Sequence, residues 1–236
     1  MMRSLLLYSR SLLFLIGYCL ITVIVSVSCM LFIWFLPYRY RFIFASSWCA
    51  FIIFWFRFAI GVKYEISGLE NIQGTPVVAL ANHQSEWETF FLYKVLAPVC
   101  PILKKELLSI PFWGWALRLY HPIAIDRSRR HEAGKSILTQ GVVRIKEGMS
   151  VVIFPQGTRT GPEKSFSRGG ASLAIAADTA ILPVAHNAGY CWPPHKFLKL
   201  PGTIKLVIGE PIPVQGRNAS DLTRQVETWV RQQLES

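Results

Sequence analysis

Charged residues are scarce in this chain, and acidic residues are missing altogether from its first 60 positions. Lysine, arginine, aspartate and glutamate make up 17% of the 236 residues, whereas about a quarter is usual for soluble domains. Hydrophobic residues supply 52%, and the mean hydropathy is +0.34. This balance indicates a membrane-associated protein, with room for one sizeable domain and an appendage.

The sequence also lacks the residue patterns of disulfide-rich and metal-binding proteins. It contains neither CxxC nor HExxH, and its five cysteines show no regular spacing. Three of them, Cys19, Cys29 and Cys49, lie in the apolar N-terminal part. We interpret the cysteines as small hydrophobic residues in the reduced state, and we expect no metal site.

Acidic residues are too few to balance the basic ones, which leaves a formal net charge of +11 and an isoelectric point near 9.7. Such a protein favours anionic lipid surfaces and anionic substrates. Nucleic acid is the alternative anionic partner, but the sequence shows no signature of a nucleic-acid-binding module. We therefore expect membrane lipids, and no nucleic acid, as partners.

The hydrophobic surplus is concentrated in two N-terminal runs. Leu12–Leu36 contains no charged residue and Phe42–Ile60 contains only Arg57, and each is close to the roughly 20 residues of a membrane-spanning helix. The segment Tyr38–Arg41 between them has the aromatic and basic residues typical of a headgroup region. Residues 1–60 are therefore predicted to form a two-helix membrane anchor, which either spans the bilayer or dips into one leaflet. A buried helical hairpin inside a soluble protein is the alternative.

Short apolar segments alternate with helical patterns over residues 61–236, which we expect to form the main domain. This alternation predicts an α/β fold. The predicted strands are Pro76–Ala81, Pro101–Leu103, His121–Asp126, Val151–Phe154, Ile181–Ala185 and Thr203–Ile208. The predicted helices are Ser85–Leu96, Leu107–Leu119 (interrupted by Pro111 and Gly114), His131–Lys146, Gly170–Asp178 and Ser220–Leu234.

Residues 82–88 read NHQSEWE and follow the first of these strands. A structural interpretation is that Ser85 and Glu88 form a capping box at the start of a helix. A catalytic interpretation places His83 on the strand-to-helix turn, at the edge where α/β sheets bind ligands. Its imidazole can fold back onto Glu88, which would fix the tautomer and leave the other ring nitrogen to act as a base. The two interpretations are compatible.

A second polar turn, Phe154–Arg159 (FPQGTR), follows the predicted strand at Val151. Backbone amides, Thr158 and Arg159 are expected at the same edge of the sheet as His83. The planar guanidinium of arginine suits phosphate oxygens. A tight turn with a solvated arginine is the alternative.

These motifs resemble those of the glycerolipid acyltransferase family, most closely its 1-acylglycerol-3-phosphate acyltransferases. Family members carry NHxxxxD, K-x-E-L followed by I-P-x-x-G, then I-D-R, FPEGTR and V-P-V. The corresponding segments here, in the same order, are Asn82–Glu88, Lys104–Leu107, Ile110–Gly114, Ile125–Arg127, Phe154–Arg159 and Leu182–Val184. The resemblance extends from about residue 62 to 214. It implies a mixed sheet flanked by helices, preceded by an apolar helix pair.

The resemblance also implies roles for individual residues. His83 would be the catalytic base and Glu88 would orient it. The substrate-binding residues implied are Lys104, Lys105, Arg127, Gln156, Gly157, Thr158 and Arg159. The histidines without an acidic residue in a motif position nearby are expected to be structural or exposed: His121, His131, His186 and His195.

Two positions depart from the family pattern. Glu88 replaces an aspartate, and its longer side chain can still reach an imidazole. Gln156 replaces the glutamate of FPEGTR, which keeps a hydrogen-bonding oxygen but removes the charge. We therefore expect Gln156 to position a hydroxyl or a loop, and not to transfer protons.

The implied reaction is acyl transfer from acyl-CoA or acyl carrier protein, as co-substrate and without a cofactor, to the sn-2 hydroxyl of lysophosphatidic acid. An acceptor such as a lyso-ornithine lipid or another lysophospholipid is an alternative, and a non-enzymatic membrane lipid-binding protein is a second. The expected location is a bacterial inner membrane, with the catalytic domain on the cytoplasmic side.

Overall fold

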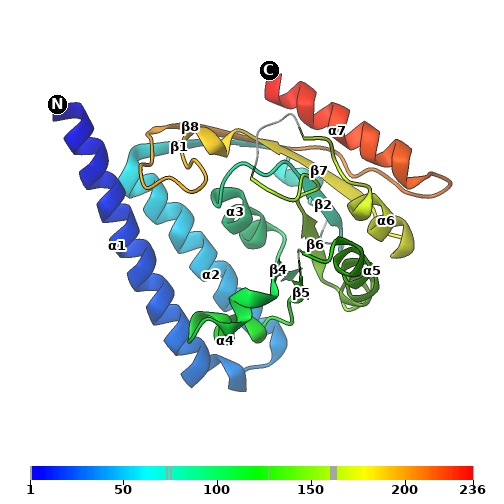
Figure 1. The fold of residues 1–236 in the computed structure, drawn as a ribbon, viewed down its shortest axis with the longest axis horizontal. Helices are drawn as coiled ribbons and strands as arrows, with labels where there is room; N and C mark the ends of the chain where they lie inside the picture. Colours follow the sequence, from blue (N-terminus) through cyan, green and yellow to red (C-terminus); the bar gives the residue numbers. More distant parts are fainter. Residues whose placement is uncertain (1, 73, 75, 127, 160–163, 236) are drawn as a thin grey trace.

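The computed structural model describes residues 2–72, 74, 76–126, 128–159 and 164–235. Its N-terminal part is a pair of long helices, α1 (Met2–Leu31) and α2 (Tyr38–Phe56), which run side by side along one side of the molecule (Figure 1). A short 3-10 turn, η1 (Ile33–Phe35), joins them, and a π-helical turn, η2 (Arg57–Gly61), ends the second helix. The predicted two-helix anchor is therefore present, and α1 begins well before the apolar run at Leu12.

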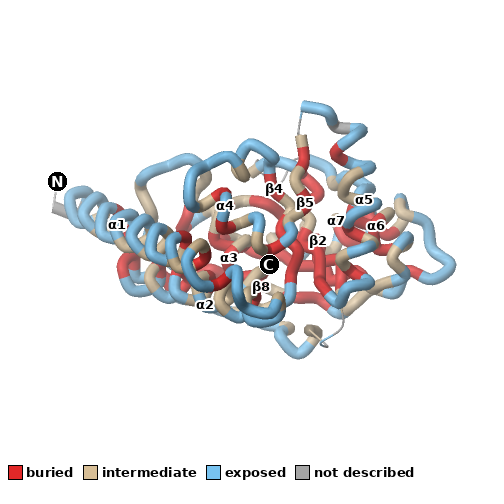
Figure 2. The backbone as a smooth tube through the Cα atoms, turned by 90° about the horizontal axis from the view of Figure 1, so that it is seen from below, coloured by how far each residue is buried: buried red, intermediate tan, exposed pale blue. Residues whose placement is uncertain are grey.

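Both helices are long and apolar enough to cross a membrane, over Ser4–Leu31 and Tyr38–Gly61. Only 17% and 33% of their most apolar windows are buried. Much of α1 and α2 is accordingly exposed along the outside of the molecule, whereas the centre of the domain is buried (Figure 2). This exposure is the opposite of what a buried hairpin requires, and it fits association with a membrane.

A six-stranded sheet in the order β1-β8-β7-β2-β6-β3 forms the centre of the domain. Only the neighbours β7 and β8 are antiparallel, so the sheet is mixed, as predicted. A second sheet pairs two short parallel strands, β4 and β5. The strands are β1 (Val62–Ser67), β2 (Val78–Ala81), β3 (Val99–Cys100), β4 (Ile102–Lys104), β5 (Ile123–Ile125), β6 (Ser150–Ile153), β7 (Ile181–His186) and β8 (Gly202–Ile208).

Helices cover both faces of the large sheet (Figure 1). The central strand β2 shows why both faces need cover, because all four of its residues are buried. Ala79 and Ala81 belong to one hydrophobic cluster with α2 and α3, whereas Val78 and Leu80 belong to another with α6 and α7. The remaining helical elements are η3 (Leu69–Asn71), α3 (Trp87–Val95), η4 (Lys105–Ser109), α4 (Trp113–Arg118), α5 (Arg130–Lys146), α6 (Gly169–Ala176), η5 (Ala188–Tyr190) and α7 (Ala219–Glu235).

The parallel strands β2, β6 and β7 end at one edge of the sheet. Leu80 is in register with Ile153, and Ala81 with Val184. Because parallel strands point the same way, the segments that follow them leave the sheet side by side. This register brings together three turns that are far apart in the sequence.

Two strands, β1 and the two-residue β3, were not predicted from the sequence. The half-exposed residues of β1 form a strand by pairing with β8 along their whole length. The helical segment Leu107–Leu119 is interrupted at Pro111, as predicted, because proline lacks an N–H and restricts the residue before it, so η4 and α4 are separate. The predicted interruption at Gly114 is not present, since this residue lies within α4. The other predicted strands and helices are confirmed to within a few residues.

Gly114 lets α4 lie against the turn before it. A Cβ at this position would clash with the carbonyl oxygen of Leu107 and lie 2.9 Å from that of Leu108. We expect Gly114→Ala to destabilise the fold by about 1–3 kcal/mol, as overpacking does. Thermal unfolding in detergent measures the change.

Gly134→Ala is the matched control for this substitution. Gly134 lies on the exposed side of α5, and an added Cβ there meets nothing within 4 Å. Alanine is favoured over glycine in a helix by about 1 kcal/mol, so the control should be neutral or stabilising. Equal melting temperatures for the two variants would contradict the close approach at Gly114.

Candidate active site

His83 and Glu88 form the centre of the polar edge. His83 Nδ1 and Glu88 Oε1 lie 2.8 Å apart, and the Glu88 side chain is fully buried. The turn before α3 folds the imidazole back onto the carboxylate, as the sequence analysis expected. A carboxylate can only accept, so Nδ1 carries the hydrogen and Nε2 carries the lone pair.

The same carboxylate oxygen also caps the helix. Glu88 Oε1 accepts the N–H of Gln84 at 3.1 Å and that of Ser85 at 2.9 Å. The Ser85 hydroxyl in turn accepts the N–H of Trp87 at 3.1 Å. The structural and catalytic interpretations therefore describe one arrangement, in which the turn that caps α3 also presents the carboxylate to the imidazole.

Burial opposes the negative charge of Glu88, and its Oε2 has no hydrogen-bond partner among the described residues. The hydrogen bonds that Glu88 accepts from His83 and from the N–H of Ser85 oppose the effect of burial, and the pKa of Glu88 lies below its ordinary value. Glu88 is therefore ionised at neutral pH. Its negative charge faces the Nδ1 side of His83 at 2.8 Å.

The FPQGTR turn holds the His83 loop from the side of β6. The Gln156 side-chain oxygen accepts the backbone N–H of His83 at 2.8 Å, and the Phe154 ring stacks on the imidazole at 4.1 Å between centroids. A neutral amide oxygen can accept this N–H, so the contact needs no charge at position 156. Gly157 makes the turn possible because its φ is +75°.

Arg159 faces the same space as His83 but is held by an acid that the sequence analysis did not select. Its Nη1 lies 2.7 Å from Glu86 Oε1, and the Trp192 indole N–H donates to Glu86 Oε2 at 2.9 Å. His83, Thr158 and Arg159 all line one cavity, together with Glu86. The guanidinium is thus oriented at the cavity wall before any ligand arrives.

The structure separates the two lysines of the K-x-E-L segment. Lys104 lines the cavity. Lys105 pairs with Asp126 at 2.6 Å and is 56% exposed, and this pairing holds the pKa of Asp126 well below its usual range. Arg127 lies outside the described residues.

His186 was expected to be structural or exposed, and nothing in the sequence indicated that it lies beside Glu88. It is buried, and its Nε2 lies 3.9 Å from Glu88 Oε1. Burial lowers the pKa of His186, although Glu88 favours its charged form. The acid that neighbours it is 98 positions away in the sequence, so only the register between β2 and β7 brings them together.

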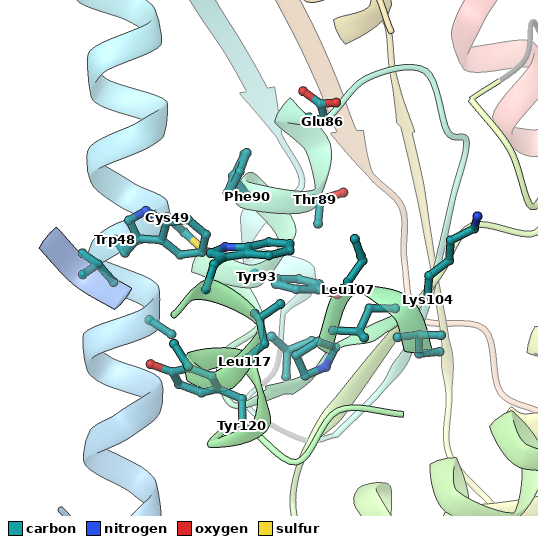
Figure 3. Close-up of a pocket in the computed structure, with 18 of the residues that line it drawn as sticks. Trp48, Cys49, Glu86, Thr89, Phe90, Tyr93, Lys104, Leu107, Leu117 and Tyr120 are labelled. Atoms are coloured by element: carbon teal, nitrogen blue, oxygen red, sulfur yellow. The ribbon is translucent and has the colours of Figure 1, made fainter. Parts of the chain in front are cut away.

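A cavity of about 670 Å³ extends from these polar residues between the anchor helices and the domain. Glu86 and Tyr120 lie at opposite ends of it, with aromatic and aliphatic side chains between them (Figure 3). Helix α1 contributes Tyr18 and Cys29, and α2 contributes Trp48. Ligand cavities are commonly apolar with a few converging polar groups, as here. Within the described residues, no group of three or more histidine, cysteine or acidic side chains could hold a metal ion.

Comparisons with known proteins agree with this geometry. A family model described as Acyltransferase matches residues 63–187. A 1-acyl-sn-glycerol-3-phosphate acyltransferase of Pseudomonas aeruginosa is 47% identical, over 84% of this chain and 80% of that protein. The human 1-acyl-sn-glycerol-3-phosphate acyltransferase beta is 30% identical, over 75% of this chain and 65% of that protein.

The fold is also similar to a solved structure. The crystal structure of the 1-acyl-sn-glycerophosphate acyltransferase from Thermotoga maritima superposes with a TM-score of 0.78 at 22% identity, over 99% of this chain and 97% of that one. The superposition therefore extends from the N-terminal helix pair to the C-terminal helix of this chain. On the family model and the relatives together, the chain belongs to the acyltransferase family.

Proposed function

We propose that the protein is a 1-acylglycerol-3-phosphate O-acyltransferase. It transfers an acyl chain from the thioester of coenzyme A or acyl carrier protein to the sn-2 hydroxyl of lysophosphatidic acid, which gives phosphatidic acid and a free thiol. The observation that carries the proposal is the buried His83–Glu88 pair at the polar end of an apolar cavity whose wall also holds Arg159. The names of the relatives in the acyltransferase family support the choice of acceptor.

The proposed chemistry needs one base and no covalent enzyme intermediate. His83 Nε2 takes the proton of the acceptor hydroxyl, and the oxygen attacks the thioester carbonyl. A carbon–oxygen bond forms, the carbon–sulfur bond breaks, and the proton on His83 passes to the departing thiolate. Glu88 favours the imidazolium that exists between these two transfers, because its carboxylate is ionised and 2.8 Å from Nδ1.

The polar groups beside His83 suit an anionic acceptor. Arg159 offers a planar fork for phosphate oxygens, and Lys104 adds a second positive charge at the cavity wall. Glu86 keeps the guanidinium in place, so less rotamer entropy is lost when a phosphate binds. Lys105 does not line the cavity and pairs with Asp126 away from it, so it is a weaker candidate for this role.

The apolar part of the cavity suits a fatty acyl chain. Its walls come from both the anchor helices and the domain, so a chain lying there passes from the reacting carbonyl toward the membrane-facing helices. An acceptor and a product that reside in a bilayer then need not be extracted into water. We place the protein at a bacterial inner membrane with the catalytic domain on the cytoplasmic side, where acyl thioesters are made.

The reaction is tested by acceptor-dependent release of thiol. Purified protein in detergent receives an acyl thioester with and without lysophosphatidic acid. Loss of a general base typically costs about 10²–10⁴-fold, so His83→Ala should lose that much of the acceptor-dependent rate. His131→Ala, an exposed histidine on α5, is the control and should keep the wild-type rate. A folded His83→Ala protein with full activity would move the base elsewhere.

Glu88→Gln separates orientation from capping. The amide oxygen of glutamine can still accept the N–H of Ser85, but it carries no charge to stabilise the imidazolium. We expect kcat to fall by about 10²–10⁴-fold with a near-normal melting temperature. The exposed Glu132→Gln on α5 is the control. Wild-type kcat in Glu88→Gln would leave Glu88 only as a helix cap.

Arg159→Gln tests the acceptor. A lost hydrogen bond to a charged group is worth about 1.5–3 kcal/mol, or roughly 10- to 100-fold in KM. We expect that rise in KM for lysophosphatidic acid, and little change for a phosphate-free acceptor such as a lyso-ornithine lipid. Arg224→Gln, an exposed arginine on α7, should leave KM unchanged. An unchanged KM in Arg159→Gln would favour the phosphate-free acceptor.

A further inference from the structure

The His83 loop is held from two neighbouring strands, and only one of the two attachments belongs to the acyltransferase motifs. On the β6 side, Gln156 accepts the N–H of His83 at 2.8 Å. On the β7 side, the contact is made by His186, the last residue of its strand. His186 belongs to none of the acyltransferase motifs, and it is not among the residues that line the cavity described above.

Asn82 and His186 are joined by three hydrogen bonds. The Asn82 side chain donates to the His186 carbonyl at 2.8 Å and accepts the His186 N–H at 3.0 Å, so it acts as a further rung of the β2–β7 pairing. The third bond comes from the imidazole, whose Nε2 lies 2.8 Å from the Asn82 carbonyl oxygen. This last bond fixes the peptide that directly precedes His83.

The hydrogen bonds also determine the protonation of His186. Its Nδ1 accepts the N–H of Ala188 at 3.3 Å, so the single hydrogen is on Nε2, which donates to Asn82. A second proton would break the bond from Ala188. The charged and titratable groups facing the ring are Glu88 at 3.9 Å and the neighbouring His83. A neutral His186 leaves the negative charge of Glu88 available to His83.

We propose that neutral His186 is a positioning residue for the acyl transfer, which holds the Asn82–His83 peptide so that the His83 imidazole meets both Glu88 and the substrate hydroxyl. The inference rests on the proposed role of His83 as the base. His186 touches no substrate in this scheme. Its effect is on the rate of the chemical step, because a misplacement of about 1 Å at a reacting group can cost about 10²-fold.

Two substitutions isolate the imidazole bond. In His186→Gln, the side-chain amide can donate from near the position of Nε2, whereas His186→Met has a similar length and no donor. The two backbone bonds to the Asn82 side chain remain in both. We expect kcat of His186→Gln to stay within about threefold of wild type and kcat of His186→Met to fall about 10- to 100-fold, with KM for lysophosphatidic acid unchanged in both.

The outcomes distinguish this inference from the proposed function. An inactive His83→Ala protein beside a fully active His186→Met protein would overturn the positioning role alone. Equal losses of kcat in His186→Gln and His186→Met would also overturn it, because the donor would then not matter. A fully active His83→Ala protein would overturn the proposed base, and this inference with it.

The protonation of His186 can also be tested on the wild-type protein, without any substitution. Nitrogen-15 spectra of the imidazoles, recorded in detergent between about pH 6 and 8, report which ring nitrogen carries hydrogen. We expect His186 to remain in the single Nε2–H form throughout. A doubly protonated His186 at neutral pH would overturn the proposal, because its charge would then compete with His83 for Glu88.

Discussion

The rest of the site depends on the contact between Glu88 and His83, because the buried carboxylate of Glu88 must remain paired. A fully buried carboxylate costs several kcal/mol unless its oxygens are well paired. Oε1 of Glu88 obtains its pairing from one imidazole and two backbone N–H groups of the same short turn. That turn must therefore keep one conformation, and a shift of the His83 backbone would break the imidazole contact and uncover the charge.

The order of the strands determines which residues support the turn that carries His83. β2 lies between β6 and β7, and all three are parallel. The turn after β2 is therefore flanked by the ends of its two neighbours. The turn after β6 supplies the Gln156 oxygen on one side, and the last residue of β7 supplies the His186 imidazole on the other. An edge strand would offer only one such neighbour, so support from both sides requires an interior strand such as β2.

The anchor helices do two things at once. On α1, Leu12 and Ile16 are exposed, whereas Phe14 and Cys29 are buried against the domain. The outward residues suit contact with lipid, and the inward ones build part of the hydrophobic core and of the cavity wall. Membrane attachment and the site are thus made by opposite faces of one helix pair. The division of the chain into an anchor and a domain at residue 60 remains a prediction.

Much of the architecture could be predicted from local patterns. The apolar runs, the alternation of strands and helices, and the histidine and glutamate of NHQSEWE depend on neighbouring residues, whose chemistry is visible in the sequence. Elements that depend on distant partners were missed. β1 is half exposed and depends on its pairing with β8, and the two-residue strand β3 depends on its pairing with β6.

By itself, the sequence determined the class of fold, the apolar helix pair, and the His83–Glu88 pair with its motifs. Each of these follows from patterns among residues that are close together in the sequence. The tertiary structure alone decided that Glu86 holds Arg159, that Lys105 is paired with Asp126, and that His186 lies beside Glu88. Those contacts join residues from different strands and loops. Their existence follows from strand order and register, which no local pattern of residues specifies.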